Sequence, residues 1–417
     1  MREIGIGSIE ELFQDIPERL RHAQFKLPSP LSELELKKEL NQLASRNIGL
    51  DNYACFLGGG SYRHFIPSTV EHVIGRSEFY TAYTPYQAEV SQGTLQGTYE
   101  YQSLACQLTG MEVSNAGMYD GSTAAGEAAI MACMITKRGK IAVSSTVNPA
   151  YRDVISTYVK ARNFSIETVE SNSSLSSDSA CLVVQQPNFL GYFEEMEAHV
   201  QRPRNIGALF IAIVDPISLG MFKPPGHYGA DIAVADGQAL GNPTGFGGPG
   251  LGVFTCRQEY LRQMPGRIVG KTVDVEGKPG YVMTMVTREQ YIRRERATSN
   301  ICTSEALMAL AAAVYLATLG GRGLRHVAEL CYHKAHYAAE KIARLKGYSP
   351  VFSKPFFKEF VIRCPVAPRQ INQALLKKGI IGGLDISHII ENGMLLCVTE
   401  MNTRQEIDRL VEILGAF

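Results

Sequence analysis

The stretch 214–252 places the strongest constraint on what this chain can fold into. The segment 208–214 is continuously apolar and ends at Asp215, and the segment 230–235 is also apolar and ends at Asp236. Short apolar runs of this kind are typical of strands that are buried on both faces of a parallel sheet. A carboxylate at the end of such a strand lies at the edge where open α/β sheets bind ligands. Asp215 could equally form a turn before the proline that follows it, and the pattern alone favours neither interpretation.

The region between residues 140 and 255 alternates strand-like apolar segments with helix-like segments. This alternation predicts a doubly wound, mostly parallel α/β sheet with helices on both faces. The candidate strands, about seven in all, are residues 113–119, 141–144, 166–169, 181–185, 208–214, 232–235 and 252–255. Residues 350–417 then alternate as strand, helix, strand and helix, which predicts a small C-terminal α/β domain.

The order of these features resembles the fold-type I pyridoxal-phosphate enzymes, and among them the P protein (glycine decarboxylase) of the glycine cleavage system. The resemblance runs from Ile9 to the C-terminus, and its main motifs are Asp215-Pro, Pro243 with Gly-Gly-Pro-Gly at 247–250, and the tyrosine-rich sequence at 83–93. It implies a fold-type I architecture, with a mixed, mostly parallel seven-stranded sheet and a small C-terminal α/β domain. It also implies that Asp215 corresponds to the carboxylate that pairs with the cofactor's pyridine nitrogen.

Gln238 is where this sequence departs from the cofactor-bearing members of that family. In those members a His-Lys pair follows the second strand, and the lysine forms a Schiff base with the cofactor. Here Gly237 and Gln238 stand in that place, and the glycine-rich loop downstream matches the family without a gap. A glutamine amide cannot form an imine, so we expect neither a catalytic lysine nor a covalent cofactor in this chain.

One branch of the family has this pattern, because in many bacteria the P protein is split into two half-length subunits. The sequence resembles subunit 1, which lacks the lysine. The resemblance implies a complex with subunit 2, two of each chain, in which subunit 2 holds pyridoxal phosphate. That complex decarboxylates glycine and passes the aminomethyl group to the lipoyl arm of the H protein. This chain is then expected to complete the cleft and to be inactive alone.

Ser122 and Thr123 open an alanine-rich helix and are candidates for holding a phosphate. Free N–H groups and hydroxyls at a helix N-terminus attract anions, and in cofactor-bearing relatives this N-terminus holds the cofactor phosphate. Capping of the helix is the commoner use of these residue types, and the missing lysine favours it here. With Asp215, the two residues are candidates for a vestigial cofactor site.

Thr298, Ser299 and Asn300 are candidates for a contribution to the partner subunit. They resemble the segment that, in fold-type I dimers, reaches the neighbouring subunit's cofactor phosphate. The alternative is a turn that only caps the apolar helix expected at 306–319.

The segment 76–102 is rich in tyrosine and glutamine and shows no regular apolar period. Aromatic side chains with polar ends suit a surface that is buried against another chain or a small polar ligand. In the family this region lies near the shared active-site cleft, although an irregular structural crossover remains the alternative for most of these side chains. The candidates for the substrate or interface are Tyr83, Tyr86, Gln87, Gln92 and Gln96.

These patterns predict four regions, which are a helical arm (1–50), an aromatic and glutamine-rich interface segment (51–110), a large α/β domain (111–320) and a small α/β domain (321–417). In the arm, Ser8 with Glu11 and Ser32 with Glu35 are predicted capping boxes. The arm could wrap a partner or pack on its own domain, and the sequence leaves both open.

Composition excludes several classes of function. Lys+Arg and Asp+Glu both number 41, so no basic surplus points to nucleic acid or to an anionic membrane. The nine cysteines are scattered, which indicates reduced thiols and a cytoplasmic protein, and the N-terminal sequence has no apolar signal region. His326, His333 and His336 share roughly one helical face, but this pattern is weak evidence, and no metal site is expected.

Three other functions compete with the family interpretation. The chain could be an autonomous enzyme that binds pyridoxal phosphate non-covalently through Asp215 and Ser122. It could bind a dinucleotide at the glycines of 245–252, but that loop does not open a helix. It could also be a regulatory scaffold without site residues.

Overall fold

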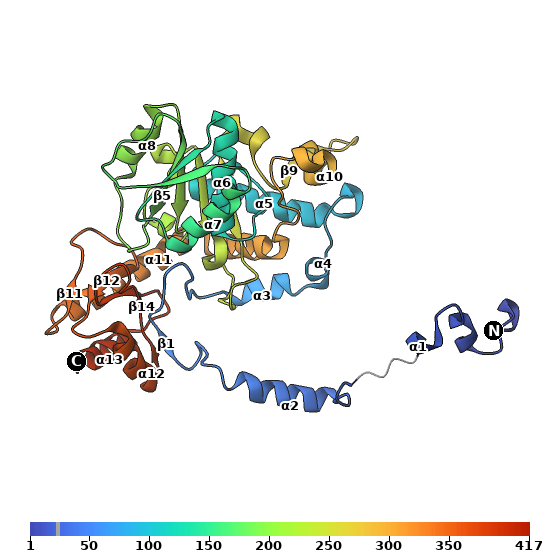
Figure 1. Cartoon of the computed structure of the whole chain (residues 1–417), viewed down its shortest axis with the longest axis horizontal. Helices are drawn as coiled ribbons and strands as arrows, with labels where there is room; N and C mark the ends of the chain where they lie inside the picture. The colour runs from blue at the N-terminus through green and yellow to red at the C-terminus, as the bar shows by residue number, and fades with distance from the viewer. Residues whose placement is uncertain (22–25) are drawn as a thin grey trace. The chain divides into compact units, whose positions relative to one another are not determined.

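The computed structural model describes residues 1–21 and 26–417, which form two compact units, Met1–Asn52 and Tyr53–Phe417 (Figure 1). The elements of the first unit are η1 (Arg2–Ile4), η2 (Ile9–Phe13), α1 (Glu18–Arg21) and α2 (Glu33–Ala44). Helix α2 begins with the predicted capping box of Ser32 and Glu35. The other predicted box does not form, because the Glu11 carboxylate accepts the N–H of Gly7 instead.

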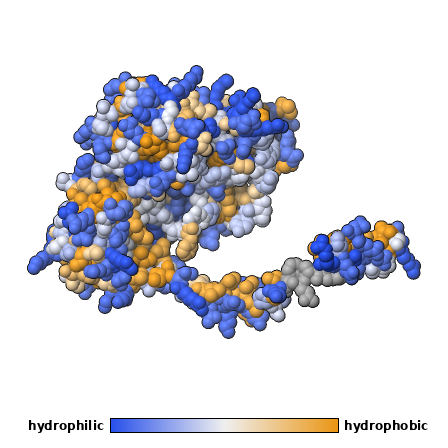
Figure 2. Space-filling model, in the orientation of Figure 1, coloured by the Kyte–Doolittle hydropathy of each residue, from blue (hydrophilic) through white to orange (hydrophobic). Residues whose placement is uncertain are grey.

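The first unit keeps its large apolar side chains on its surface, where Figure 2 shows apolar patches along it. Among residues 1–21 and 26–52, no side chain is buried. The exposed ones include Ile9, Leu12, Phe13, Ile16, Leu34, Leu36, Leu40 and Leu43. Short helices gain most of their stability from packing an apolar face. The described residues of this unit form no core against which such a face could pack.

The second unit is organised around a sheet whose strand order is β2-β8-β7-β6-β5-β3-β4. The pairs from β7 to β4 are parallel, whereas β8 pairs antiparallel with both β7 and β2. Its strands are β2 (Val113–Ser114), β3 (Lys140–Ser144), β4 (Ser165–Val169), β5 (Ser179–Gln186), β6 (Leu209–Val214), β7 (Ile232–Asp236) and β8 (Gly252–Cys256). Within residues 26–417, the predicted mixed, mostly parallel seven-stranded sheet is therefore confirmed.

Helices cover both faces of this sheet, as Figure 1 shows. In β6, Ile211 and Ile213 pack in the core with α6 (Gly121–Thr136) and α7 (Pro149–Lys160). The alternate residues Phe210 and Ala212 pack in the other core, with α5 (Gln92–Thr109), α8 (Met196–Arg204) and the first part of α11 (Ala306–Ala343). A strand buried on both faces has no polar side to expose, which is why 208–214 is apolar throughout.

Helix α5 was not predicted, because its buried face does not follow an apolar period. Its buried residues are Leu95, Tyr101, Gln102, Ala105 and Thr109. The Gln102 amide is satisfied by the backbone of Val269, from which it accepts an N–H and to which it donates. A polar residue on the inner face hides the helical pattern from a count of apolar positions.

The C-terminal part begins within α11. That helix is interrupted at Gly320, whose φ of 59° and ψ of −179° are not helical. By length and composition α11 could cross a membrane, but Ala311, Ala312 and Tyr315 in its first half are fully buried in the core. The predicted strands and helices follow as β12 (Glu359–Arg363), α12 (Pro368–Lys377), β15 (Gly393–Cys397) and α13 (Arg404–Leu414), with β11 (Ser349–Pro350) and β14 (Leu384–Asp385) completing a sheet in the order β11-β12-β15-β14.

The long charged segment after β8 forms an antiparallel hairpin of β9 (Ile268–Val273) and β10 (Pro279–Thr284). The remaining elements are β1 (Ala54–Cys55), which pairs with β13 (Ile380–Ile381), and α3 (Ser68–Ile74), α4 (Ser77–Tyr80), η3 (Ala88–Val90), η4 (Ser218–Gly220), α9 (Pro225–Tyr228), η5 (Gly237–Ala239), η6 (Gln258–Gln263), η7 (Val286–Arg288), α10 (Gln290–Arg293) and η8 (Arg294–Arg296).

Candidate functional site

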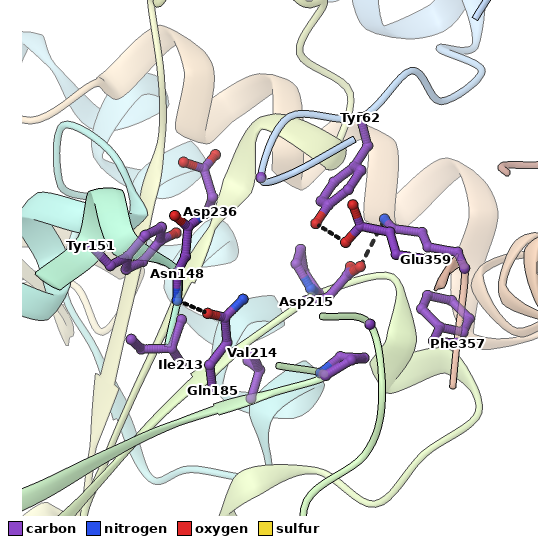
Figure 3. Close-up of a pocket in the computed structure, with 15 residues that line it drawn as sticks. Tyr62, Asn148, Tyr151, Gln185, Ile213, Val214, Asp215, Asp236, Phe357 and Glu359 are labelled. Atoms are coloured by element: carbon purple, nitrogen blue, oxygen red, sulfur yellow. Dashed lines mark hydrogen bonds and ion pairs between the residues drawn. The ribbon is translucent and has the colours of Figure 1, made fainter. Parts of the chain in front are cut away.

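The carboxyl ends of β6 and β7 carry Asp215 and Asp236, as the sequence predicted. Beside them lie Gln238, on η5, and Lys358, which precedes β12 of the C-terminal sheet. These four residues define what we call the strand-edge site, and Figure 3 shows its lining. Asp215, Asp236 and Lys358 line a cavity with a volume of about 30 Å³.

The Asp215 carboxylate is fully engaged by the chain itself. Its Oδ2 lies 2.7 Å from the Lys358 ammonium, and its Oδ1 accepts the N–H of Ile217 at 2.9 Å. The Lys358 side chain is only 2% exposed, and its Nζ lies 3.5 Å from the centre of the Tyr62 ring. Burial disfavours the charged lysine, but the charge of Asp215 outweighs it and raises the pKa of Lys358. The two charges therefore form a buried ion pair.

Glu359 also lines the strand-edge site. Its Oε1 accepts the N–H of Gly59, and its Oε2 accepts the hydroxyl of Tyr62, both at 2.7 Å. Burial raises the pKa of Glu359, although these two hydrogen bonds act in the other direction. Tyr62 thus contacts both the Glu359 carboxyl group and the Lys358 ammonium, and it lines the site with them (Figure 3).

The side-chain amide of Gln238 is hydrogen-bonded through both its nitrogen and its oxygen. Its Nε2 donates to the carbonyls of Asn242 at 2.8 Å and Tyr62 at 3.0 Å, and its Oε1 accepts the N–H of Tyr62 at 2.9 Å. The amide therefore ties the loop before α3 to the turn after β7. A lysine at this position has no acceptor and could not make the same set of bonds.

The N-terminus of α6 is occupied by two of the chain's own carboxylates. Asp120 is the N-cap, and its Oδ1 accepts the N–H of Thr123 at 2.7 Å and the hydroxyl of Ser122 at 2.9 Å. The Asp236 Oδ2 accepts the N–H of Gly121 at 3.2 Å. Thr123 takes part in the predicted capping, because its hydroxyl accepts the N–H of Asp120 at 3.2 Å, but the N-cap is Asp120 and not Ser122. The sequence signal was present, because aspartate before Gly-Ser-Thr is a strong N-cap.

Asp236 has a strongly perturbed carboxyl group. Burial raises its pKa to about 6, and the nearby Asp120 carboxylate adds to this, against the N–H groups of Gln238 and Gly121 that lower it. An anion at this helix end would therefore meet two acidic groups in place of free N–H donors.

Pyridoxal phosphate does not fit the strand-edge site as this chain folds it. The open volume is only about 30 Å³, the Asp215 carboxylate has a lysine partner, and the start of α6 is capped by carboxylates. The residues predicted as a vestigial cofactor site, Ser122, Thr123 and Asp215, do lie in one region. Each makes its contacts with the chain itself.

His64, Cys331 and Glu400 form a second buried cluster next to Lys358, with ligand atoms close enough to share a metal ion. Glu400 Oε2 lies 2.7 Å from His64 Nδ1 and accepts the Cys331 thiol at 3.3 Å. Lys358 Nζ lies 3.1 Å from His64 Nε2. Hydrogen bonds within the chain account for each of these atoms, and the adjacent ammonium disfavours a cation.

Thr298, Ser299 and Asn300 do not cap the helix that follows them, because α11 begins at Ala306 with Glu305 as its N-cap. The Ser299 side chain points inward, is 7% exposed and accepts the N–H of Ile301 at 3.1 Å. Asn300 is exposed and lines a cavity of about 400 Å³ together with Glu127 and Arg162. The three residues therefore differ in exposure, since Ser299 is buried, Thr298 is partly exposed and Asn300 is exposed.

The tyrosine-rich segment lies against the β9–β10 hairpin and forms what we call the tyrosine surface. Its exposed apolar and aromatic residues are Tyr80, Tyr83, Tyr86, Val90, Val273, Val275, Val282, Tyr291 and Ile292. Tyr83 is 84% exposed and borders a cavity of about 280 Å³ that is also lined by Thr84, Thr303, Ser304 and Arg267. Sequence reasoning missed Arg267, because a single arginine in a charged segment carries no distinctive pattern.

Arg267 organises this surface. Its guanidinium donates to the Cys302 carbonyl at 2.9 Å and the Tyr86 hydroxyl at 3.3 Å, and it lies 5.5 Å from the centre of the Tyr86 ring. It also borders the open cavity, where it is the cationic side chain among hydroxyl and apolar groups in the described lining. Such a pocket suits a small anionic or polar group.

The predicted glutamines have separate roles. Gln92 binds the edge of the hairpin, since its Oε1 accepts the N–H of Tyr281 at 2.9 Å and its Nε2 donates to the Tyr281 carbonyl at 2.8 Å. Gln96 donates to Glu100 along the exposed side of α5, and Gln87 precedes η3. The structure therefore places Tyr83 in the lining of the cavity and Tyr86 against Arg267 at its edge, whereas Gln92 binds the hairpin.

Comparison with known proteins gives a consistent result. The family described as "Glycine cleavage system P-protein" matches residues 1–414. The probable glycine dehydrogenase (decarboxylating) subunit 1 of Thermomicrobium roseum is 52% identical to this chain, over 99% of this chain and 96% of the relative. A crystal structure of glycine decarboxylase (P-protein) of the glycine cleavage system, in inhibitor-bound form, has a TM-score of 0.94 at 42% identity and covers 100% of this chain and 96% of that chain.

More distant structures show the fold alone. A C-DES mutant with glycine covalently linked to its PLP cofactor has a TM-score of 0.63 at 14% identity and covers 88% of this chain and 98% of that chain. The predicted fold-type I architecture is thereby confirmed.

Proposed function

Because the chain belongs to the glycine cleavage system P-protein family, we propose that it is the cofactor-free subunit of a two-subunit glycine decarboxylase. With a homologous subunit that holds pyridoxal phosphate, it decarboxylates glycine and transfers the aminomethyl group to the lipoyl arm of the H protein. The cofactor supplies the electron sink for loss of carbon dioxide. This chain supplies surface, orientation and exclusion of water, and is inactive alone.

The observation that carries this proposal is the state of the strand-edge site. In a chain that is 52% identical to a probable glycine dehydrogenase subunit, the site that would hold a cofactor has an open volume of only about 30 Å³. The same chain leaves aromatic side chains and a cavity of about 280 Å³ open at the tyrosine surface. A contribution to catalysis is therefore expected through this surface, against a partner.

The partner is a chain of the same fold, and the assembly contains two copies of each. The name "subunit 1" of the relatives supports a second, different subunit. The nine free cysteines, most of them buried, are consistent with a reducing compartment such as the cytoplasm.

The alternative of an autonomous enzyme that binds pyridoxal phosphate non-covalently is disfavoured by the same geometry. Both groups on which it would depend, Asp215 and Ser122, already have partners in the chain. A scaffold without site residues is disfavoured by the open cavity and by Arg267 at its edge.

The test is reconstitution with a subunit-2-type P protein and a lipoylated H protein. Glycine-dependent exchange of labelled carbon dioxide is measured for each chain alone and for the two together. We expect exchange only when both chains are present, in a complex that size-exclusion chromatography isolates. Full exchange by the cofactor-bearing subunit without this chain would refute the proposal.

A further inference from the structure

Asp215 and Lys358 join two parts of the second unit that are far apart in the sequence. Asp215 ends a strand of the large sheet, and Lys358 immediately precedes β12 of the C-terminal sheet. Their side chains are 10% and 2% exposed, and the two charged atoms lie 2.7 Å apart. Removing one member of a buried pair leaves the other charge without compensation, which is far more costly than replacing both.

The Lys358 ammonium is also held by neutral groups. One is the face of the Tyr62 ring, and another is His64, whose Nε2 accepts from Nζ at 3.1 Å. His64 Nδ1 then donates to Glu400 at 2.7 Å. Burial and the adjacent ammonium lower the pKa of His64, so the imidazole is neutral and this hydrogen-bond chain is complete. The arrangement is consistent with a lysine that keeps its charge.

We propose that Lys358 is a built-in counter-charge that takes the place of a cofactor at the strand-edge site and fixes the C-terminal sheet against the large sheet. The two sheets are therefore held together at this site without any ligand. The proposal rests on the geometry of this chain and not on the proposed activity.

Two other features support it independently. At the start of α6, Asp120 and Asp236 accept the N–H groups that would otherwise attract an anion. The Gln238 amide makes two hydrogen bonds to the backbone of Tyr62 and one to the nearby Asn242 carbonyl. The charge of Asp215, the N-terminus of α6 and the position of the missing lysine are thus each satisfied by side chains of the chain itself.

The first experiment is a double-mutant cycle on the purified full chain. Lys358→Met and Asp215→Asn are each expected to lower the Tm by about 3 to 6 °C, because each leaves an unpaired buried group. The double variant is expected to recover more than half of the summed loss. Lys223→Met is the matched control, since Lys223 pairs with Glu197 at 2.9 Å on the surface.

Either of two results would overturn this part of the proposal. One is a Tm for Lys358→Met within 1 °C or so of the control variant. The other is a double variant that is as unstable as the sum of the single variants, which would show that the two side chains act independently. The double variant keeps the test decisive if a single variant fails to fold.

Chemical rescue separates lost charge from lost packing. Lys358→Ala removes the ammonium and its stem, and n-propylammonium should restore part of the Tm by binding beside Asp215. The same concentration of n-propanol should restore less, and neither should stabilise the wild type in this way. Equal rescue by the alcohol would assign the role of Lys358 to packing and contradict a counter-charge.

The last experiment uses pyridoxal phosphate itself as the probe. Absorbance titration of the wild-type chain should show no saturable binding, and borohydride reduction should leave no adduct at one specific lysine. Gln238→Lys alone should behave in the same way, because Lys358 and Tyr62 still fill the site. Saturable one-to-one binding to the wild type that is lost in Asp215→Asn would overturn the proposal.

Discussion

The strand-edge site and the tyrosine surface use polar groups in opposite ways. At the strand-edge site, the Asp215 carboxylate and the Lys358 ammonium each have partners inside the chain, and the free volume is about 30 Å³. At the tyrosine surface, Tyr83 and Val90 are at least 80% exposed beside a cavity of about 280 Å³. The polar groups of the first region have partners within the chain, whereas the second region exposes large apolar side chains to water.

This difference shows how a fold that serves a cofactor can be kept without one. Buried charges at a strand edge are too costly to leave unpaired, so loss of the ligand requires substitutes from the chain itself. Exposed aromatic groups cost less and can be kept for a partner. We therefore expect substitutions in the first region to act on stability, and substitutions in the second to act on activity in the complex.

The largest expected effect on stability contrasts two glycines. A Cβ on Gly191, at φ +89°, would lie 2.1 Å from the Glu359 carbonyl oxygen, whereas a Cβ on Gly280 in the hairpin meets no atom of the described residues closer than 3.8 Å. Gly191→Ala should lower the free energy of unfolding by roughly 3 kcal/mol or more, because strain and overpacking add. Gly280→Ala should change it by less than about 0.5 kcal/mol. Urea denaturation measures both, and equal losses would contradict the contrast.

The next effect concerns pH. Asp236 has a pKa of about 6 in the folded chain against an ordinary 3.8, so the folded state holds the proton more tightly. The stability this group contributes is present below about pH 4 and is lost as the pH rises through 6. The loss amounts to at most about 3 kcal/mol. Asp236→Asn should gain stability over the wild type across this range, in urea denaturation at several pH values.

Glu276→Gln, an exposed change in the hairpin turn, is the matched control for this pH series. Its curve should run parallel to that of the wild type. A constant difference between Asp236→Asn and the wild type from pH 4 to 7 would show that Asp236 does not titrate in this way.

A smaller effect is expected on activity at the tyrosine surface. Arg267→Met keeps the aliphatic stem but loses the bonds to Tyr86 and Cys302. Glycine-dependent carbon dioxide exchange by the complex should fall about ten- to a hundredfold, as expected for one or two charge-assisted hydrogen bonds. Arg262→Met, at an exposed position on η6, is the control. Equal activity of the two variants would remove Arg267 from the functional surface.

The sequence predicts the fold well because the sheet has a simple apolar pattern. Strands such as β5 and β6 are buried on both faces and appear as continuous apolar runs. Helix α5 was missed because the buried side of that helix includes Gln102 and Thr109, whose polar groups bond to backbone within the core. The partner of Gln102 is the distant Val269, which leaves no local signal, and Thr109 bonds to the Ala105 carbonyl of its own helix.

The site is less predictable than the fold. Asp215 is a candidate from its position after a strand, and Gln238 is one from the family resemblance. Lys358 lies more than a hundred residues away and acts only because the C-terminal sheet brings it there. In the sequence it is an ordinary lysine in a Phe-Phe-Lys-Glu segment. A counter-charge that is supplied by tertiary structure cannot be read from local spacing.

The smallest expected effect separates the three residues proposed to act on the partner subunit. Ser299 is 7% exposed and accepts the N–H of Ile301, whereas Asn300 is exposed at the edge of a cavity of about 400 Å³. Ser299→Ala should therefore lower the free energy of unfolding by about 1 kcal/mol and leave cofactor retention by the complex unchanged. Asn300→Ala should leave stability unchanged and weaken retention about two- to tenfold, the size of one neutral hydrogen bond.

The measurement is a pyridoxal-phosphate titration of complexes that carry each substitution, with integrity checked by size-exclusion chromatography. Thr298→Ala belongs in the same series. The Thr298 backbone carbonyl accepts from Arg162 at 3.4 Å, and this contact survives the substitution, so the variant tests the side chain alone. If Asn300→Ala binds the cofactor as the wild type does, the turn does not reach the partner's cofactor. The tyrosine surface, which includes Tyr83 and Arg267, would then be the candidate for contact with the active site. Contact with the active site would then be confined to the second of the two regions.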